Sequence, residues 1–143
     1  MAGSVTLTSS EIAGSGGIRK YALAWVSDAS GAVSGTSHAL APGTIVIVEF
    51  VSDSGGTQPT SLYDVDFLDD HGASMFDDGT GTTIGANLSN TIGEHRAPLM
   101  VGSSSVHTYV RAWLHGGTYQ LTVANAGNAK GGTVNIFQAP GVL

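Results

Sequence analysis

Apolar and polar residues alternate along much of this chain with a period of two, and this pattern most restricts how the chain can fold. In the segment 18–27, Tyr21, Leu23 and Trp25 fall on one face of an extended strand, while Lys20 and its alternate neighbours fall on the other. Further strands are expected around 5–7 and at 44–51, 63–67, 106–114, 119–123 and 133–137. No segment keeps a helical period. The sequence therefore predicts an all-β protein.

Clusters of Gly, Asn, Asp and Ser separate the expected strands, and these residues tolerate the backbone angles of tight turns. Short strands at this spacing are typical of a β-sandwich or a jelly-roll-like barrel with long Gly/Ser/Thr-rich loops. The last strands, between 106 and 137, are expected to form a three-stranded meander. The expected organisation is a flexible N-terminal arm at 1–17, a β-domain at 18–138 and a C-terminal tail at 139–143.

The apolar positions of these strands give a predicted hydrophobic core. The segment 44–51 is apolar on both faces, as expected for a central or interface strand. The predicted core residues are Leu23, Trp25, Ile47, Tyr63, Val65, Phe67, Val110, Leu121, Val123 and Ile136.

Charge is scarce and negative, which bears on the possible partners. The chain of 143 residues carries 5 Lys and Arg against 11 Asp and Glu, a net charge of −6, so binding to a phosphate backbone is not expected. It has no Cys, no signal-peptide pattern and no transmembrane run, so a soluble protein made in the cytosol is expected. Charged residues make up 11% of the chain against a typical ~25%. This composition favours a protein covered by neighbours, although an ordinary β-domain with a Ser/Thr-rich surface is an alternative.

The segment 59–78 holds six of the eleven acidic residues. Asp64 and Asp66 would share one strand face about 6.5–7 Å apart, opposite the apolar residues of that strand. Asp69 and Asp70 open a DDHG turn, where Asp is favoured. We interpret the segment as a hairpin with a solvated outer face. A weak cation site at Asp64, Asp66, Asp69 and Asp70 is the alternative, but the calcium-loop pattern fails because no Gly follows Asp66 at the required step.

No sequence motif for catalysis or cofactor binding is present. The five histidines are scattered, without H-x-H or H-E-x-x-H spacing: His38, His71, His95, His107 and His115. A zinc site assembled from distant strands stays open as an alternative. The segment around Ser37 lacks the second Gly of a nucleophile elbow, and no helix is expected after it. We therefore expect neither an enzyme nor a cofactor-dependent protein.

Three stretches together resemble a known group of proteins. They are WVSDASGAVSG at 25–35, SDSGGTQPTSLYDVDFLDDHGASMF at 52–76 and VANAGNAKGGTVNIF at 123–137. Their order and spacing resemble small structural proteins encoded in the virion modules of tailed bacteriophages. The resemblance implies a virion component on the capsid surface, synthesised in the host cytoplasm. β-domains of this size in such phages are often capsid decoration (cement) proteins that bind the major capsid protein and clamp neighbouring subunits.

Three functional hypotheses follow. The first is a capsid decoration protein that stabilises the shell, and the second is a head–tail interface or tail structural protein. The third is a carbohydrate or host-surface binding module that uses the aromatic side chains of Trp25, Tyr109, Trp113 and Tyr119. A homotrimer is expected, with a dimer as the alternative. Its contacts with the shell would come from 1–17 and 79–96, and no nucleic-acid or membrane partner is expected.

Overall fold

The computed structural model describes residues 2–77, 83–91, 93–96, 99–101, 109–111 and 113–141. Of residues 95, 99–101 and 109–111 it describes the backbone only. The elements are β1 (Ser4–Glu11), β2 (Arg19–Val26), β3 (Ser37–Leu40), β4 (Gly43–Ser52), the 3-10 turn η1 (Gly55–Thr57), β5 (Asp64–Leu68), β6 (Glu94–Arg96), β7 (Leu99–Val101), β8 (Tyr109–Arg111), β9 (Trp113–Leu114), β10 (Gly117–Ala124) and β11 (Gly131–Ala139). The expected all-β fold is confirmed.

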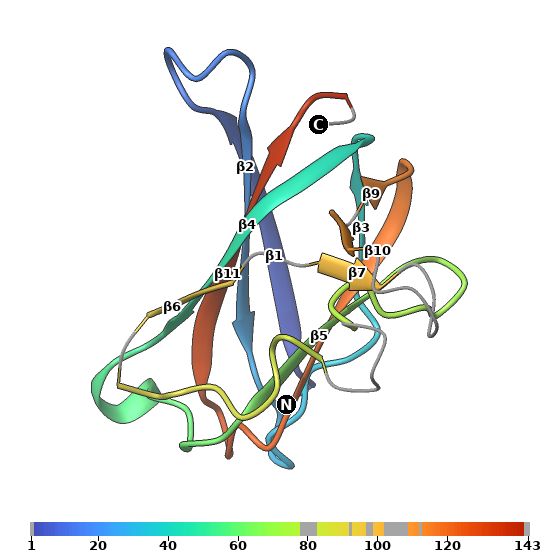
Figure 1. The fold of residues 1–143 in the computed structure, drawn as a ribbon. Coiled ribbons are helices and arrows are strands. Elements are labelled where there is room, and N and C mark those ends of the chain that lie inside the picture. The colour runs from blue at the N-terminus through green and yellow to red at the C-terminus, as the bar shows by residue number, and fades with distance from the viewer. Residues whose placement is uncertain are drawn as a thin grey trace.

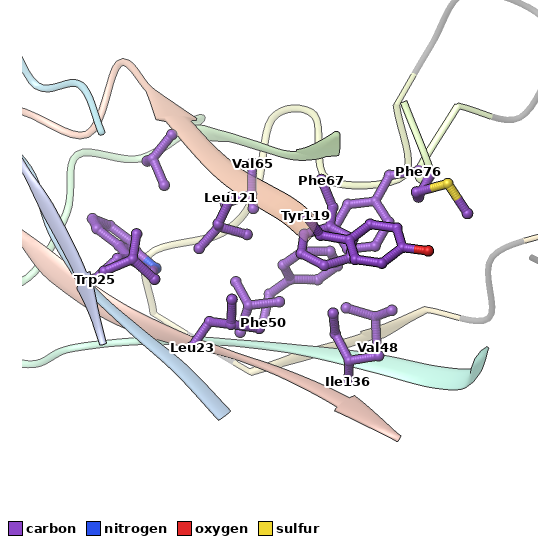
Figure 2. Packing of buried hydrophobic residues seen from close by; sticks show 14 of the residues in the cluster. Leu23, Trp25, Val48, Phe50, Val65, Phe67, Phe76, Tyr119, Leu121 and Ile136 are labelled. Atoms are coloured by element: carbon purple, nitrogen blue, oxygen red, sulfur yellow. The ribbon is translucent and has the colours of Figure 1, made fainter. Parts of the chain in front are cut away.

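The strands form two main antiparallel sheets. The six-stranded sheet has the order β1-β2-β11-β4-β6, with β9 also paired to β4, and the three-stranded sheet has the order β3-β10-β5. A further pair is formed by β7 and β8. The two main sheets pack on each other as a sandwich, as the ribbon in Figure 1 shows. Figure 2 shows core side chains of both sheets meeting between them, for example Leu23 and Ile136 from one sheet and Leu121 from the other.

Most of the predicted core is buried. Eight of the ten predicted core residues are buried: Leu23, Trp25, Tyr63, Val65, Phe67, Leu121, Val123 and Ile136. The side chain of Val110 lies outside the described residues. The exception among the described side chains is Ile47, which is only half-buried.

A β-bulge in β4 explains why the prediction for Ile47 is wrong. Ile136 pairs with Val48 and Phe137 with Ile47, but Gln138 pairs with Ile45, so Val46 is left over in the register. One extra residue reverses the alternation of the strand. Ile45 and Val48 therefore both face the core, and Ile47 is turned to the opposite face.

The expected flexible arm at 1–17 is a second correction. Its residues Ser4–Glu11 form β1, which pairs with β2 along its whole length. Val5 is 7% exposed and Leu7 packs against the core, so two apolar side chains stabilise the strand at the sheet edge. The tail expected at 139–143 also begins inside a strand, because Ala139 ends β11 and is 4% exposed.

The expected three-stranded meander at the end of the chain is a third correction. β10 lies between β3 and β5, whereas β11 lies between β2 and β4 in the other sheet. The loop 125–130 therefore crosses from one sheet to the other. Both strands have an apolar inner face, and they pack face to face across the core instead of pairing side by side.

Candidate functional site

Asp64 connects two loops at one end of the sandwich. Its Oδ1 accepts a hydrogen bond of 2.9 Å from the backbone N–H of Asn87, and its Oδ2 accepts one of 2.7 Å from Asn125 Nδ2. Asp64 is the first residue of β5, so the strand holds the carboxylate between the two loops. This carboxylate thus has partners that stabilise the local structure, and it is not simply solvated.

Asp66 also bonds within its own hairpin. Its Oδ1 accepts from the hydroxyl of Ser74 at 2.6 Å and from the backbone N–H of Phe67 at 2.7 Å. Asp64 and Asp66 share a strand face, as the sequence predicts, but they bind different partners. The structure therefore does not bring Asp64 or Asp66 into one site with Asp69 and Asp70.

The turn after β5 places Asp69 and Asp70 beside a second turn. Asp69 Oδ1 accepts from the backbone N–H groups of His71 at 2.9 Å and Ala73 at 2.8 Å. The N–H of Ala73 is the main reason that the pKa of Asp69 is held below its ordinary value. Asp70 Oδ1 lies 2.7 Å from His71 Nδ1 and 3.7 Å from Nε2 of His115, which lies between β9 and β10. One ligand atom each from Asp69, Asp70 and His115 lies within 4.8 Å of the others.

Gly117 keeps the space between the two turns open. A Cβ at this position would lie 3.3 Å from His115 Cε1 and 3.5 Å from Asp70 Oδ2. The φ of Gly117 is +134°, a conformation that favours glycine. A larger residue would therefore crowd both the imidazole and the carboxylate.

Tyr119 is completely buried beside this cluster. Burial is the main reason that the pKa of its hydroxyl is raised, and the negative charges of Asp69 and Asp70 raise it further. The nearby backbone N–H groups of His115 and Gly116 lower this pKa, although neither meets hydrogen-bond geometry with the hydroxyl. Within the described part of the chain, no group reaches hydrogen-bond geometry with it. In Figure 2 the hydroxyl points away from Leu121, out of the end of the aromatic cluster.

The remaining histidines do not join this cluster in the described structure. His38, on β3, pairs with Tyr119 in the register, and its buried Nε2 has no hydrogen-bond partner among the described residues. His95 pairs with Glu49 through the backbone of β6, and its side chain lies outside the described part. His107 lies outside the described residues altogether.

A second candidate site is the side of the six-stranded sheet that faces away from the core, here called the outer face. The register places its residues in rows: Thr6, Ala24, Thr133 and Val51, then Thr8, Ala22, Asn135 and Glu49, then Ser10, Lys20, Phe137 and Ile47, with Val26 at the end of β2. Two of these residues are charged. Asn135 Nδ2 donates to Glu49 Oε2 at 2.6 Å, and Lys20 Nζ lies 5.6 Å from the centre of the Phe137 ring. Val26 is 45% exposed and Val51 37% exposed, so the face combines short side chains with accessible apolar surface.

The aromatic residues expected to stack on sugars do not form a shared platform. Trp25 is 2% exposed and Tyr119 is 0% exposed, so both belong to the core. Trp113 on β9 is 36% exposed, while the side chain of Tyr109 lies outside the described part. At most two of the four residues can therefore contact a glycan.

Sequence reasoning missed the group formed by Asp69, Asp70, His115 and Tyr119. Asp69 and Asp70 lie in one Gly-containing turn, and His115 and Tyr119 flank another, but no local motif links the two turns. Only the pairing of β10 with β5 brings them together. The uncovered outer face could be suspected from the apolar residues on both faces of 44–51.

Comparison with known proteins adds no assignment to this geometry. No protein-family model matches the chain, and neither a curated protein nor a solved structure matches it significantly. Among the described residues, no helix has the length and apolar character needed to cross a membrane.

Proposed function

We propose that this chain is a capsid decoration protein of a tailed phage, which binds the outer capsid surface and stabilises the shell. The observation that carries the proposal is the outer face of the six-stranded sheet. It combines short apolar and hydroxyl side chains, among them the exposed Val26 and Val51, with two charged residues, Lys20 and Glu49. Uncovered surface of this kind is typical of protein–protein contacts. The resemblance to virion structural proteins supplies the kind of assembly.

We assign the outer face to contacts between copies of the chain. Identical chains usually associate with closed symmetry, and a trimer, or alternatively a dimer, would cover this face in each copy. Substituting Val51 with Lys would introduce an unpaired charge into such a contact, at a cost of affinity. Ala39→Lys is a matched control, since Ala39 is exposed on the other sheet.

The loop end of the sandwich, formed by residues 53–62, 83–91 and 125–130, is the proposed contact with the major capsid protein. Backbone bonds join these loops, from Thr60 N to Ala126 O at 2.9 Å and from Leu62 N to Leu88 O at 3.0 Å. Leu62 is 60% exposed and has a φ of 65°, which is unusual for leucine. An exposed apolar side chain on hydrogen-bonded loops loses little freedom when a partner covers it.

This proposal replaces the arm mechanism expected for residues 1–17, because β1 is part of the sheet. It keeps the segment 79–96 as a source of shell contacts through its described residues 83–91. The proposed role is non-catalytic, and it assigns Asp64 and Asp66, which each bond to local partners, to structural contacts. Repeated attachment over a lattice would let weak individual contacts add up.

The number of copies in purified virions tests the proposal. A decoration protein is present at a copy number comparable to that of the major capsid protein, within a small integer ratio. A head–tail interface or tail protein is present at a dozen copies or fewer, on the order of one ring. Quantitative mass spectrometry of particles separates these cases, and a low copy number would favour the head–tail or tail alternative.

The oligomeric state tests the use of the outer face. Sedimentation velocity of the purified chain is expected to give a trimer or dimer, and Val51→Lys is expected to shift it toward monomer. Ala39→Lys should sediment like the unmodified chain. An unmodified chain that stays monomeric at high concentration would contradict the assignment of the outer face.

A further inference from the structure

We propose that Asp69, Asp70 and His115 bind one divalent transition-metal ion, with Zn²⁺ as the best match, and that Tyr119 supports this site from the core. This inference is independent of the proposed function in the capsid. It goes beyond the cation site considered at Asp64, Asp66, Asp69 and Asp70, because it excludes the first two residues and adds a histidine from another turn.

The positions of the donor atoms suit a single ion. The three ligand atoms lie within 4.8 Å of one another. Two atoms that each bind zinc at about 2.1 Å in a tetrahedral arrangement lie roughly 3.4 Å apart. Asp70 Oδ1 and His115 Nε2 are separated by 3.7 Å, too long for a hydrogen bond and close to that spacing. A small movement of two turn side chains would complete the arrangement.

The donors of Asp69 and His115 remain available for a ligand, whereas Asp70 Oδ1 would be shared between the ion and His71 Nδ1, which lies 2.7 Å away. The described hydrogen bonds of Asp69 both go to Oδ1, which leaves Oδ2 for an ion. Gly117 has no side chain, so the space between His115 and Asp70 Oδ2 stays open. The His115 side chain is 43% exposed and the Asp70 side chain 39% exposed, which gives an ion a path from solvent.

The buried hydroxyl of Tyr119 is the independent observation that points to a ligand. It is inaccessible and lacks a hydrogen-bond partner among the described residues, and the Tyr119 ring lies 5.6 Å from the ring of the proposed ligand His115. Buried hydroxyl groups normally have a partner, because leaving one unpaired is unfavourable. A water molecule held in the fourth position of a zinc ion would provide that partner. Such outer partners are a regular part of metal sites.

The donor set selects the class of metal. One imidazole with two carboxylates suits zinc and its first-row neighbours, whereas Ca²⁺ and Mg²⁺ prefer six or more oxygen ligands. Three protein ligands leave one position for water. The bound ion would join the turn after β5 to the turn before β10, and would thereby fasten one end of the three-stranded sheet.

Binding of Zn²⁺ to the full chain tests the proposal by isothermal titration calorimetry. The expected result is one ion per chain, with a rise of a few degrees in Tm when zinc is in excess. Asp70→Asn and His115→Gln should each lower the affinity at least about 10-fold, and Tyr119→Phe should lower it roughly 10-fold as an outer partner. Asp64→Asn is the control, because Asp64 lies on the same acidic segment but bonds to Asn87 and Asn125, outside the proposed ligand set.

Each other outcome overturns the proposal. These outcomes are no zinc binding by the unmodified chain, equal binding by all variants, and a loss in Asp64→Asn as large as that in His115→Gln. Stronger binding of Ca²⁺ than of Zn²⁺ would also contradict it. Circular dichroism of each variant without metal checks that the fold is retained, so that loss of affinity reports on the site itself.

Discussion

The rings of Phe67 and Tyr119 stack with their centroids 5.2 Å apart and their planes 9° apart. Phe67 also stacks on Phe76 at 5.6 Å, and Phe76 meets Phe50 of the opposite sheet edge-on at 5.8 Å. A continuous row of four rings therefore runs from Tyr119, next to His115, to Phe50 in the six-stranded sheet. Figure 2 shows these rings together in the core.

Phe67→Ala is expected to be among the most damaging single substitutions. It removes the ring that contacts both Tyr119 and Phe76, at a cost of about 3–5 kcal/mol in the free energy of unfolding. Urea denaturation measures this change. Leu62→Ala serves as the control, because Leu62 is 60% exposed and should change stability far less. Similar unfolding midpoints for the two variants would contradict the assigned core.

Asp64→Ala is expected to loosen the two loops that Asp64 joins. Loss of the bonds from Asn87 N–H and Asn125 Nδ2 should cost about 0.5–1.5 kcal/mol each. Hydrogen exchange at the Asn87 amide should become faster. Asp70→Ala, measured without metal, is the control and should stay within about ±0.5 kcal/mol. Unchanged exchange at Asn87 would show that Asp64 does not hold this loop.

Removal of residues 2–11 is expected to destabilise the domain, in contrast to removal of a flexible arm. It deletes β1 and the buried side chain of Val5, whose full burial is worth about 1.5–3 kcal/mol. It also exposes the edge of β2, which favours aggregation. Thermal unfolding should show a lower Tm and less reversible melting. A truncated chain with an unchanged Tm would mean that β1 contributes nothing to the fold.

Asp28 is expected to give a pH-dependent contribution to stability. Its Oδ1 accepts from the hydroxyl and N–H of Ser30 and from the N–H of Ala32. The Ser30 hydroxyl is the main reason that the pKa of Asp28 lies below its ordinary value of 3.8. Because the folded state favours the ionised form, the contribution is complete above the unfolded-state pKa and is lost as pH falls through the folded-state pKa.

Denaturation of the unmodified chain and of Asp28→Ala over a pH series measures this contribution. The difference in stability should be constant near neutral pH and should shrink below about pH 4. A difference that grows on acidification would reverse the sign of the assigned shift.

The sequence predicts the fold class well because alternation is a property of each strand by itself. Tyr63, Val65 and Phe67 could be assigned to the core from their own segment. The face of Ile47 could not, because a bulge is decided by pairing with β11. The partners of β10 and β11 depend on packing across the core. The approach of His115 to Asp70 follows from the pairing of β10 with β5, and no local sequence signal indicates it.

Occupancy of undecorated capsids is the most direct test of the central claim. Purified protein is mixed with capsids that lack it, and co-sedimentation is measured over a range of concentrations. Leu62→Asp is compared with Ala39→Asp, a charge of the same sign at an exposed position outside the proposed contact. We predict saturable binding, a capsid more resistant to heating, and weaker binding for Leu62→Asp than for Ala39→Asp. Failure of the unmodified chain to co-sediment with capsids at any concentration would contradict the claim.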